Sequence, residues 1–233
     1  ASPETEPNPD AYEMAPYGVV AVSVGDGNAE LFRSLGVDVV LSGGQSMNPS
    51  TEDVLGAIRS LSAQTVIVLP NNSNILLAAN QAAELAGRPV VVLPTRTLPQ
   101  GMAAMLAFRE EESEAANIER MTKSFERVKT GSVTQAVRDT LMDGLDIKAG
   151  QYIGILDKTI VATAASAEEA GKELLERMLT GGGEIVTILT GEGTSREQGD
   201  TLAAWLSERH ADAEVEVHEG GQPLYPFLFA VEP

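Results

Sequence analysis

The feature that most constrains the fold is an alternation of short β-branched runs with helical patterns in the first half of the chain. The runs are apolar at successive positions, so both faces of each strand need to be covered. A mostly parallel sheet with helices on both sides meets this need. We predict a doubly wound first lobe, with strands at 19–24, 37–41, 65–69 and 90–93 and helices that start near Asn28, Ser50 and Asn74.

The pattern changes after Gly131. Short β runs then follow one another closely and are separated by turn sequences such as Asp143-Gly144, which indicates antiparallel or mixed pairing. The strands expected here are 133–137, 152–156, 159–164, 184–189, 215–217 and 227–231, with helices at 166–179 and 195–209. The second half is therefore predicted to be an α/β lobe with a mixed sheet.

An amphipathic helix at about 113–128 joins the two halves, because apolar residues recur there at spacings of three and four. We place the first lobe at 17–112, and the bridging helix with the second lobe at 113–233. Residues 1–16 hold four prolines among acidic and small residues and bury too little apolar area to fold, so we expect a disordered linker. A linker at the start, without an initiator methionine, leads us to expect a longer parent protein.

Charge excludes several classes of partner. The chain has 34 acidic and 16 basic residues and a formal net charge of -18, so a polyphosphate or an anionic membrane would be repelled. Solubility is the simplest role of this charge, and an acidic face for a basic partner is the alternative. The absence of cysteine fits a reducing compartment, and no apolar stretch is long enough for a membrane span. We expect a cytoplasmic protein without nucleic acid or membrane partners.

Two loops share the pattern G-G-Q-x-x-x-P. They begin at Gly43-Gly44-Gln45 and at Gly220-Gly221-Gln222, and each follows a predicted strand. Paired glycines allow close backbone approach, and glutamine offers both a donor and an acceptor. Ligands in open α/β sheets collect beyond the carboxyl ends of strands. The loops are thus candidates for a ligand or partner site, and two unrelated turns explain the match equally well.

Further polar loops follow the third and fourth strands, so together with the loop at 43–49 we expect three polar loops at one edge of the first sheet. The free N–H groups of the helix capped by Ser50 could hold a carboxylate or phosphate. The asparagines are explained more simply by turns and caps, and Arg96 suits a ligand contact or a structural ion pair equally well. The candidate ligand- or partner-binding residues are Gly43, Gly44, Gln45, Asn48, Ser50, Asn71, Asn72, Asn74, Arg96, Thr97, Gln100, His218, Gly220, Gly221 and Gln222.

No catalytic set is recognisable. His210 and His218 lie on different predicted elements, and no histidine spacing typical of a metal site occurs. Gly25-Asp26-Gly27 matches only part of a dinucleotide fingerprint, because Glu30 occupies the place of the third glycine. His218 precedes the second glycine-rich loop, where it is either a binding residue or a satisfied histidine at a strand end. We predict no catalytic and no metal-binding residues.

With these loops in view, the chain resembles the C-terminal region of the bacterial fatty acid kinase A subunit, whose amino-terminal part is like the nucleotide-binding domain of dihydroxyacetone kinases. The segments that carry the resemblance are 43–53, 69–75, 96–101 and 217–227. The region is similar in turn to the DegV-like, fatty-acid-binding B subunits, which have two α/β lobes with a lipid head group between them. The resemblance thus implies a DegV-like fold over residues 17 to the end.

In that wider family a Ser-Gln-Pro-Ser-type loop and a late His-Gly-rich strand end hold the acyl carboxylate. Asn48-Pro49-Ser50 and 218–221 fall at the corresponding positions, although the first loop reads Gln-Ser-Met-Asn-Pro-Ser here. The resemblance implies that the Mg-ATP site belongs to the absent upstream part, so we expect no cofactor in this fragment.

Our leading hypothesis is a non-catalytic domain that docks the fatty-acid-binding B subunit, or forms a homodimer, so that the upstream domain phosphorylates the fatty acid. The alternative is a fatty acid or another small anion in the cleft between the lobes.

Overall fold

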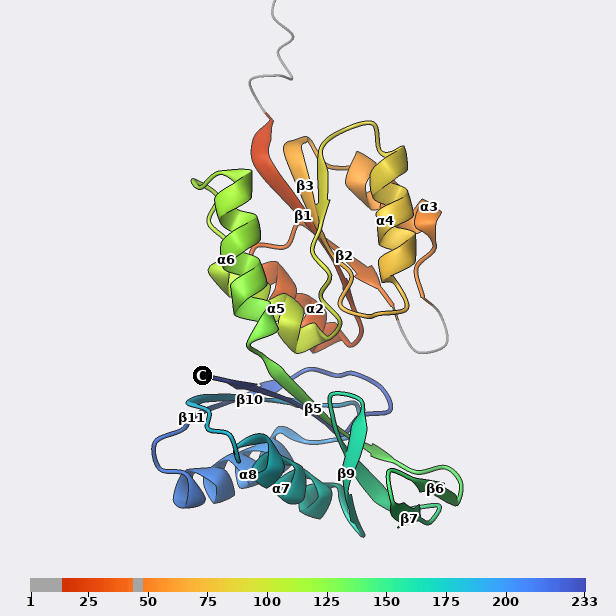
Figure 1. Cartoon of the computed structure of the whole chain (residues 1–233), viewed down its shortest axis with the longest axis vertical. Coiled ribbons are helices and arrows are strands. Elements are labelled where there is room, and N and C mark those ends of the chain that lie inside the picture. Colours follow the sequence, from red (N-terminus) through yellow and green to blue (C-terminus); the bar gives the residue numbers. More distant parts are fainter. Residues whose placement is uncertain (1–13, 44–47) are drawn as a thin grey trace, which may run out of the picture.

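The computed structural model describes residues 14–43 and 48–233. They form two stacked α/β lobes, each built on its own sheet (Figure 1). The first sheet has the strand order β2-β1-β3-β4, and all its neighbouring strands are parallel. The second has the order β11-β10-β12-β5-β8-β9 and is mixed. The predicted fold class is confirmed.

The strands of the first sheet are buried because helices cover both faces. At the centre, Val20 of β1 lies between Val39 of β2 and Val68 of β3. Alternate residues of β1 enter different clusters, with Val19 packed on one side and Val20 on the other. These strands are β1 (Ala15–Ser23), β2 (Val39–Ser42), β3 (Ala63–Leu69) and β4 (Val90–Val92).

One face of this sheet carries α2 (Asp26–Ser34), α5 (Leu98–Ala107) and α6 (Glu114–Glu126), and the other carries α3 (Thr51–Arg59) and α4 (Leu76–Leu85). Ser50 begins α3 as predicted. Its hydroxyl accepts from the Asp53 N–H at 3.1 Å, and its own N–H donates to the Asp53 carboxylate at 2.9 Å. These bonds hold the pKa of Asp53 below its ordinary value.

Helix α5 corrects the prediction of a polar loop at 94–101, because most of its residues lie downstream of Thr97 in a regular helix. Thr97 caps this helix by accepting from the Gln100 N–H at 3.2 Å. Pro99 lies in the first turn, where a missing N–H does no harm. The cap and the proline were visible in the sequence, but the prolines on both sides of Arg96 favoured a loop.

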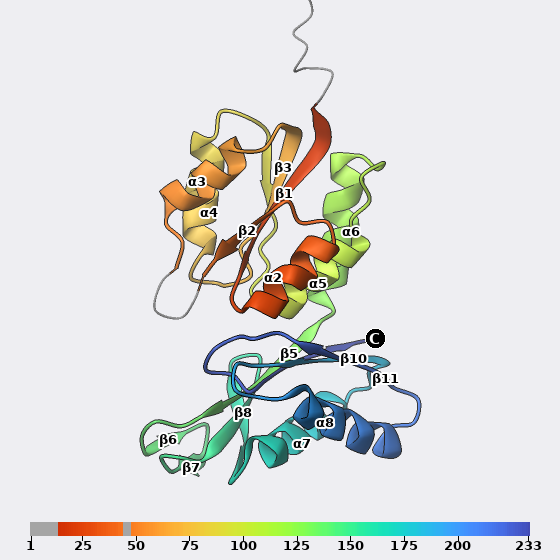
Figure 2. The ribbon, with the colours of Figure 1, turned by 180° about the vertical axis from the view of Figure 1, so that it is seen from behind.

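The two lobes are joined through α6 and β5 (Lys129–Gln135). Met121 and Phe125 of α6 are buried against the first lobe, and the chain then enters the second sheet directly (Figure 2). We expected the first strand of this lobe at 133. It begins at Lys129, so Gly131 lies inside the strand. A Cβ atom on Gly131 would collide with the sulfur of Met178, which packs over it. The glycine marks close packing and not a break. The division at residue 112 remains a prediction.

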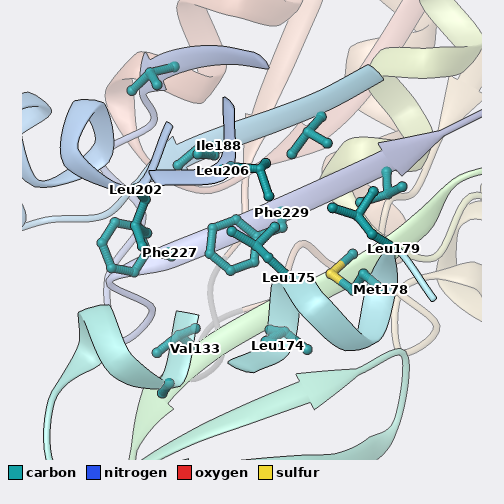
Figure 3. Packing of buried hydrophobic residues seen from close by; sticks show 14 residues of the cluster. Val133, Leu174, Leu175, Met178, Leu179, Ile188, Leu202, Leu206, Phe227 and Phe229 are labelled. Carbon is teal, nitrogen blue, oxygen red and sulfur yellow. The ribbon is translucent and has the colours of Figure 1, made fainter. Parts of the chain in front are cut away.

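The remaining strands of the second sheet are β8 (Tyr152–Leu156), β9 (Thr159–Ala164), β10 (Ile185–Thr190), β11 (Glu214–Glu219) and β12 (Phe227–Glu232). Helices α7 (Ala167–Met178) and α8 (Arg196–Arg209) cover the face that points away from the first lobe. Figure 3 shows the core beneath them, where Leu174 and Leu202 pack near Phe227 and Phe229, whose rings stack at 5.8 Å. The opposite face of the sheet is left for the first lobe.

A small hairpin of β6 (Thr140–Met142) and β7 (Leu145–Ile147) extends from this lobe. Its turn is Asp143-Gly144, with φ values of 53° and 77°. Two consecutive positive φ angles are typical of the type I′ turn that this dipeptide predicts. Among the described residues, no helix is long and apolar enough to span a bilayer.

Candidate functional site

The second glycine-rich loop connects the lobes. Gly220 accepts a hydrogen bond through its carbonyl from the Asn28 N–H, at 2.9 Å, at the start of α2. The backbones lie so close that a Cβ atom on Gly27 would overlap the carbonyl oxygen of Glu219. A Cβ atom on Gly25 would meet Gly220 and Gln222 in the same way. Glycine is required at both positions because another backbone occupies the space of a side chain.

Asn28 and Gln222 complete this contact with a buried side-chain pair. Both residues are 0% exposed, and the Asn28 Nδ2 donates to Gln222 Oε1 at 2.9 Å. The Gln222 Nε2 donates to the carbonyls of Leu189 and Tyr225 at 3.0 and 3.1 Å. Both amide hydrogens of Gln222 are therefore used within the protein, and one of its acceptor positions is filled. We call the contact of Gly25, Gly27 and Asn28 with residues 219–222 the interlobe latch.

The latch gives Gly25-Asp26-Gly27 a structural role. The sequence suggested a fragment of a dinucleotide fingerprint, in which glycines admit a pyrophosphate. In the structure, the same freedom from side chains admits the chain at Glu219 and Gly220. The close approach that these glycines allow is thus made by protein.

Beside the latch lies a cavity of about 220 Å³, which we call the polar cavity. It brings together five of the predicted site residues, namely Gly43, Asn71, Asn72, Thr97 and Gln222. Thr97 also bridges the lobes, because its hydroxyl lies 2.9 Å from that of Thr130 in β5. The expected convergence of polar loops thus includes residues from both lobes.

Two buried side chains of this cavity have polar atoms without partners among the described residues, Ser23 Oγ and Asn71 Oδ1. The Asn71 amide is held by its other end, which donates to the Val22 carbonyl at 2.9 Å. The one charged residue among those that line the cavity is Asp157. A carboxylate ligand would therefore meet hydroxyl and amide groups here but no lining cation.

A second cavity, of about 280 Å³, lies between the helices α2 and α5 and the second sheet. We call it the apolar cavity, because most of its lining is Leu31, Leu35, Met102, Ala103, Leu106, Leu189 and Ala230. Pro99 lines both cavities. The interlobe interface thus has a polar end at the latch and an apolar end beneath α5.

His218 lies at the apolar cavity and not among the glycine-rich loops where we expected it. Its Nε2 is 3.3 Å from the Glu216 carboxylate, two residues before it on β11. Glu232, on β12, lines the same cavity, and burial, followed by the charge of Glu216, raises its pKa above the ordinary 4.5. Titratable groups therefore gather at one end of an otherwise apolar space.

Of the predicted residues that the structure describes, the rest line neither cavity. Asn48 and Ser50 are exposed at the start of α3, and Asn74 donates its N–H to Asn72 Oδ1 at 2.9 Å. Gln100 accepts from the Arg96 N–H at 2.7 Å, and the Arg96 guanidinium has no ion pair within the described ranges. Gly44 and Gln45 lie outside the described residues, so their part in the site stays a prediction.

Sequence reasoning missed Ser23, Asn28, Ser132, Glu216 and Glu232. Ser23 ends a buried strand and offered the same signal as the loops that were selected. Asn28 marks only the start of a helix in the sequence, and nothing local predicts that its partner is Gln222. In the parts of the chain that the structure describes, no group of three or more histidine and acidic residues could hold a metal ion.

Comparison with known proteins places these features in a family. Residues 18–232 match the family model of the fatty acid kinase A-subunit-like C-terminal domain. Protein YloV of Bacillus subtilis is 50% identical over 217 residues, which cover 93% of this chain and 39% of that protein. An uncharacterized Staphylococcus epidermidis protein is 42% identical over 214 residues, with 92% and 39% covered. The chain thus spans about two fifths of these relatives.

Solved structures share the fold at low sequence identity. A fatty-acid-binding DegV family protein from Thermus thermophilus has a TM-score of 0.67 at 15% identity, with 94% of this chain and 100% of that one covered. The Streptococcus pneumoniae fatty acid kinase B3 protein, loaded with linoleic acid, has a TM-score of 0.61 at 11% identity, covering 93% and 99%. Together with the family match, this likeness establishes that the chain belongs to the fatty acid kinase A-subunit-like C-terminal family and has a DegV-family fold.

Proposed function

We propose that this domain is a non-catalytic docking scaffold, which brings a DegV-like, fatty-acid-binding partner to the rest of a longer fatty acid kinase-like protein. The family match and the much greater length of its relatives support a role inside a larger chain. In this proposal an upstream domain holds Mg-ATP and phosphorylates the fatty acid that the partner presents. The present chain supplies position and no chemistry.

The observation that carries the proposal is the interlobe latch. Gly220 and Gly221 donate their N–H groups to the Thr190 carbonyl, both at 2.9 Å, and Gly220 accepts from Asn28. Gln222 is bonded on both sides of its amide. The N–H groups of Gly220 and Gly221 and the side-chain amide of Gln222 are thus bonded within the protein, although Asn28 Oδ1 has no partner among the described residues. Rigidly joined lobes suit a docking surface, because little conformational entropy is lost when a partner binds.

The size of the cavities supports the same proposal. Each is smaller than the roughly 300–1,000 Å³ of ordinary ligand sites, at about 220 and 280 Å³. The polar cavity has no lining cation for a carboxylate among its described residues. These properties favour docking over ligand carriage.

Calorimetric titration tests the proposal. The lipid-loaded DegV-like protein of the same organism is titrated into this chain, and light scattering measures the mass of the chain alone and of the mixture. We expect a 1:1 complex or, if the domain pairs with a second copy, a dimer. Neither a complex nor a dimer at micromolar concentrations would refute docking. As a control, lysozyme, a basic protein, is titrated into this chain at the same ionic strength. It measures nonspecific attraction to the acidic surface.

The apolar cavity favours a second candidate function, the binding of a fatty acid or another small anion between the lobes. Its aliphatic lining suits an acyl chain, and His218 lies beside it. Native mass spectrometry of the purified protein, with thermal shifts on adding fatty acids, tests this candidate. Lipid that co-purifies with the native protein but not with Thr187→Ile, which fills part of the cavity, would support this candidate. The absence of both lipid and shift would eliminate it.

A further inference from the structure

Three cations of α6 lie on one side of the helix. Arg120, Lys123 and Arg127 are separated by three and four residues, which places them on adjacent turns of the same face. All three line a hollow of about 450 Å³. Its apolar lining includes Leu106, which is 60% exposed, and Ile185, which is 38% exposed. Cationic and apolar groups therefore face the same open space.

The hollow continues along the molecule. Arg127, Glu232 and Pro233 also line a second hollow, of about 390 Å³, which adds Lys129 and the glycines at 181–183. We call the two hollows together the α6 groove. It takes its walls from both lobes, with α5 and α6 on one side and β10 and β12 on the other (Figure 2). It is longer than a site for a single small anion.

The groove departs from the charge of the rest of the chain. Four of the 16 basic residues line it, against two acidic residues, Glu184 and Glu232, in a protein of net charge -18. Arg120 is 3.9 Å from Glu112, and Lys123 is 2.8 Å from Glu119, but these pairs are well exposed and easily exchanged. Arg127 makes no ion pair within the described part of the chain. Arg120, Lys123 and Arg127 are thus available to a partner, whereas Lys129 Nζ donates to the Met178 carbonyl at 3.2 Å.

We propose that the α6 groove binds an acidic, extended segment of a partner protein, with an apolar side chain placed on Leu106 and Ile185. An acidic segment would be repelled over most of this surface and attracted here, so charge also selects the site. The apolar residues give a polypeptide an anchor that inorganic phosphate lacks. A segment bound in this groove would contact both lobes at the junction of α6 and β5. The inference stands independently of the proposed function.

Fluorescence anisotropy with a short labelled peptide, in which glutamates surround a central leucine, tests the proposal. The peptide with glutamine in place of glutamate, and the peptide with alanine in place of leucine, separate the charged and apolar contributions. We expect the glutamate peptide to bind most tightly, and the other two to bind less tightly. Binding should weaken as salt rises, because the contacts are exposed and screened.

Charge reversal locates the binding site. Lys123→Glu and Arg127→Glu should each weaken the peptide on the order of fivefold to tenfold at low salt, since each replaces an attraction by a repulsion. The matched controls Arg138→Glu and Lys158→Glu change the net charge equally, at exposed cations that do not line the groove. They should weaken binding by less than about twofold. Circular dichroism confirms that all four variants fold.

Four results of the binding assays would overturn the proposal. They are no peptide binding, equal effects of the groove and control variants, complete competition by millimolar inorganic phosphate, and preferential binding of phosphatidylglycerol vesicles over the peptide. Concentration-dependent dimerisation that Arg127→Glu abolishes, without peptide binding, would also overturn it, because the occupant would then be a second copy. Tight binding that depends on Lys123, Arg127 and the peptide's leucine would support it.

Discussion

The two ends of the interlobe interface differ in how they are filled. At the latch, backbone meets backbone without space for a Cβ atom, and Asn28 and Gln222 are fully buried. Beneath α5, the lobes leave about 280 Å³ between aliphatic side chains and three titratable groups. One interface therefore combines a tight polar contact with an underfilled apolar one. The latch fixes the relative position of the lobes, and the apolar cavity leaves space for larger side chains.

The largest effect is expected at the latch. Gly27→Ala should lower the free energy of unfolding by about 3 kcal/mol, because the new methyl group overlaps a backbone carbonyl that cannot rotate away. Urea unfolding followed by the fluorescence of Trp205, the single tryptophan, measures the change. Gly56→Ala is the matched control, since its Cβ would meet nothing within 4 Å, and it should stabilise α3 slightly. Equal effects of the two variants would contradict the latch.

Loss of the buried amide should rank next. Gln222→Ala leaves the Leu189 and Tyr225 carbonyls without this donor and opens a void, so we expect a loss of about 2 kcal/mol. Gln64→Ala, at an exposed position of β3, is the control and should change stability little. A variant as stable as the control would mean that the latch depends on its glycines alone.

Filling the open end should have a smaller effect of opposite sign. Thr187 lies on β10 at the apolar cavity, and Thr187→Ile adds apolar volume while keeping a β-branched strand residue. We expect a gain of about 1 kcal/mol in urea unfolding. A loss of stability would show that the cavity cannot accept added volume without displacing α5.

The smallest effect is expected from Glu232, and it depends on pH. Because its pKa is raised in the folded state above 4.5, the folded protein holds this proton over a pH range in which the unfolded chain has lost it. Stability from this group is therefore lost as pH rises through the folded pKa. Glu232→Gln should stabilise the protein slightly at pH 7 and have less effect near pH 4. Unfolding midpoints measured across this range check the sign, and a change independent of pH would contradict it.

The latch and the cavities differ in how far the sequence predicted them. Glycine pairs, caps and polar loop residues are local signals, and four of the residues selected from them, Gly43, Asn71, Thr97 and Gln222, line one cavity. His218 was placed by its distance along the chain from Gly220. The side chains of a strand alternate between faces, and β11 turns this residue toward α2 and α5. Position along the chain did not predict which cavity it would line.

By itself, the sequence determined the two α/β lobes, the mostly parallel first sheet, the helix cap at Ser50 and the turn at Asp143-Gly144, because each depends on apolar periodicity or on backbone angles of neighbouring residues. Tertiary structure decided what approaches Gly27, which side chain pairs with Asn28, and where the lobes leave space. The Asn28–Gln222 pair joins residues almost two hundred positions apart, so such contacts depend on how the lobes pack together. The glycine-rich loop signalled close approach, and the fold supplied the partner.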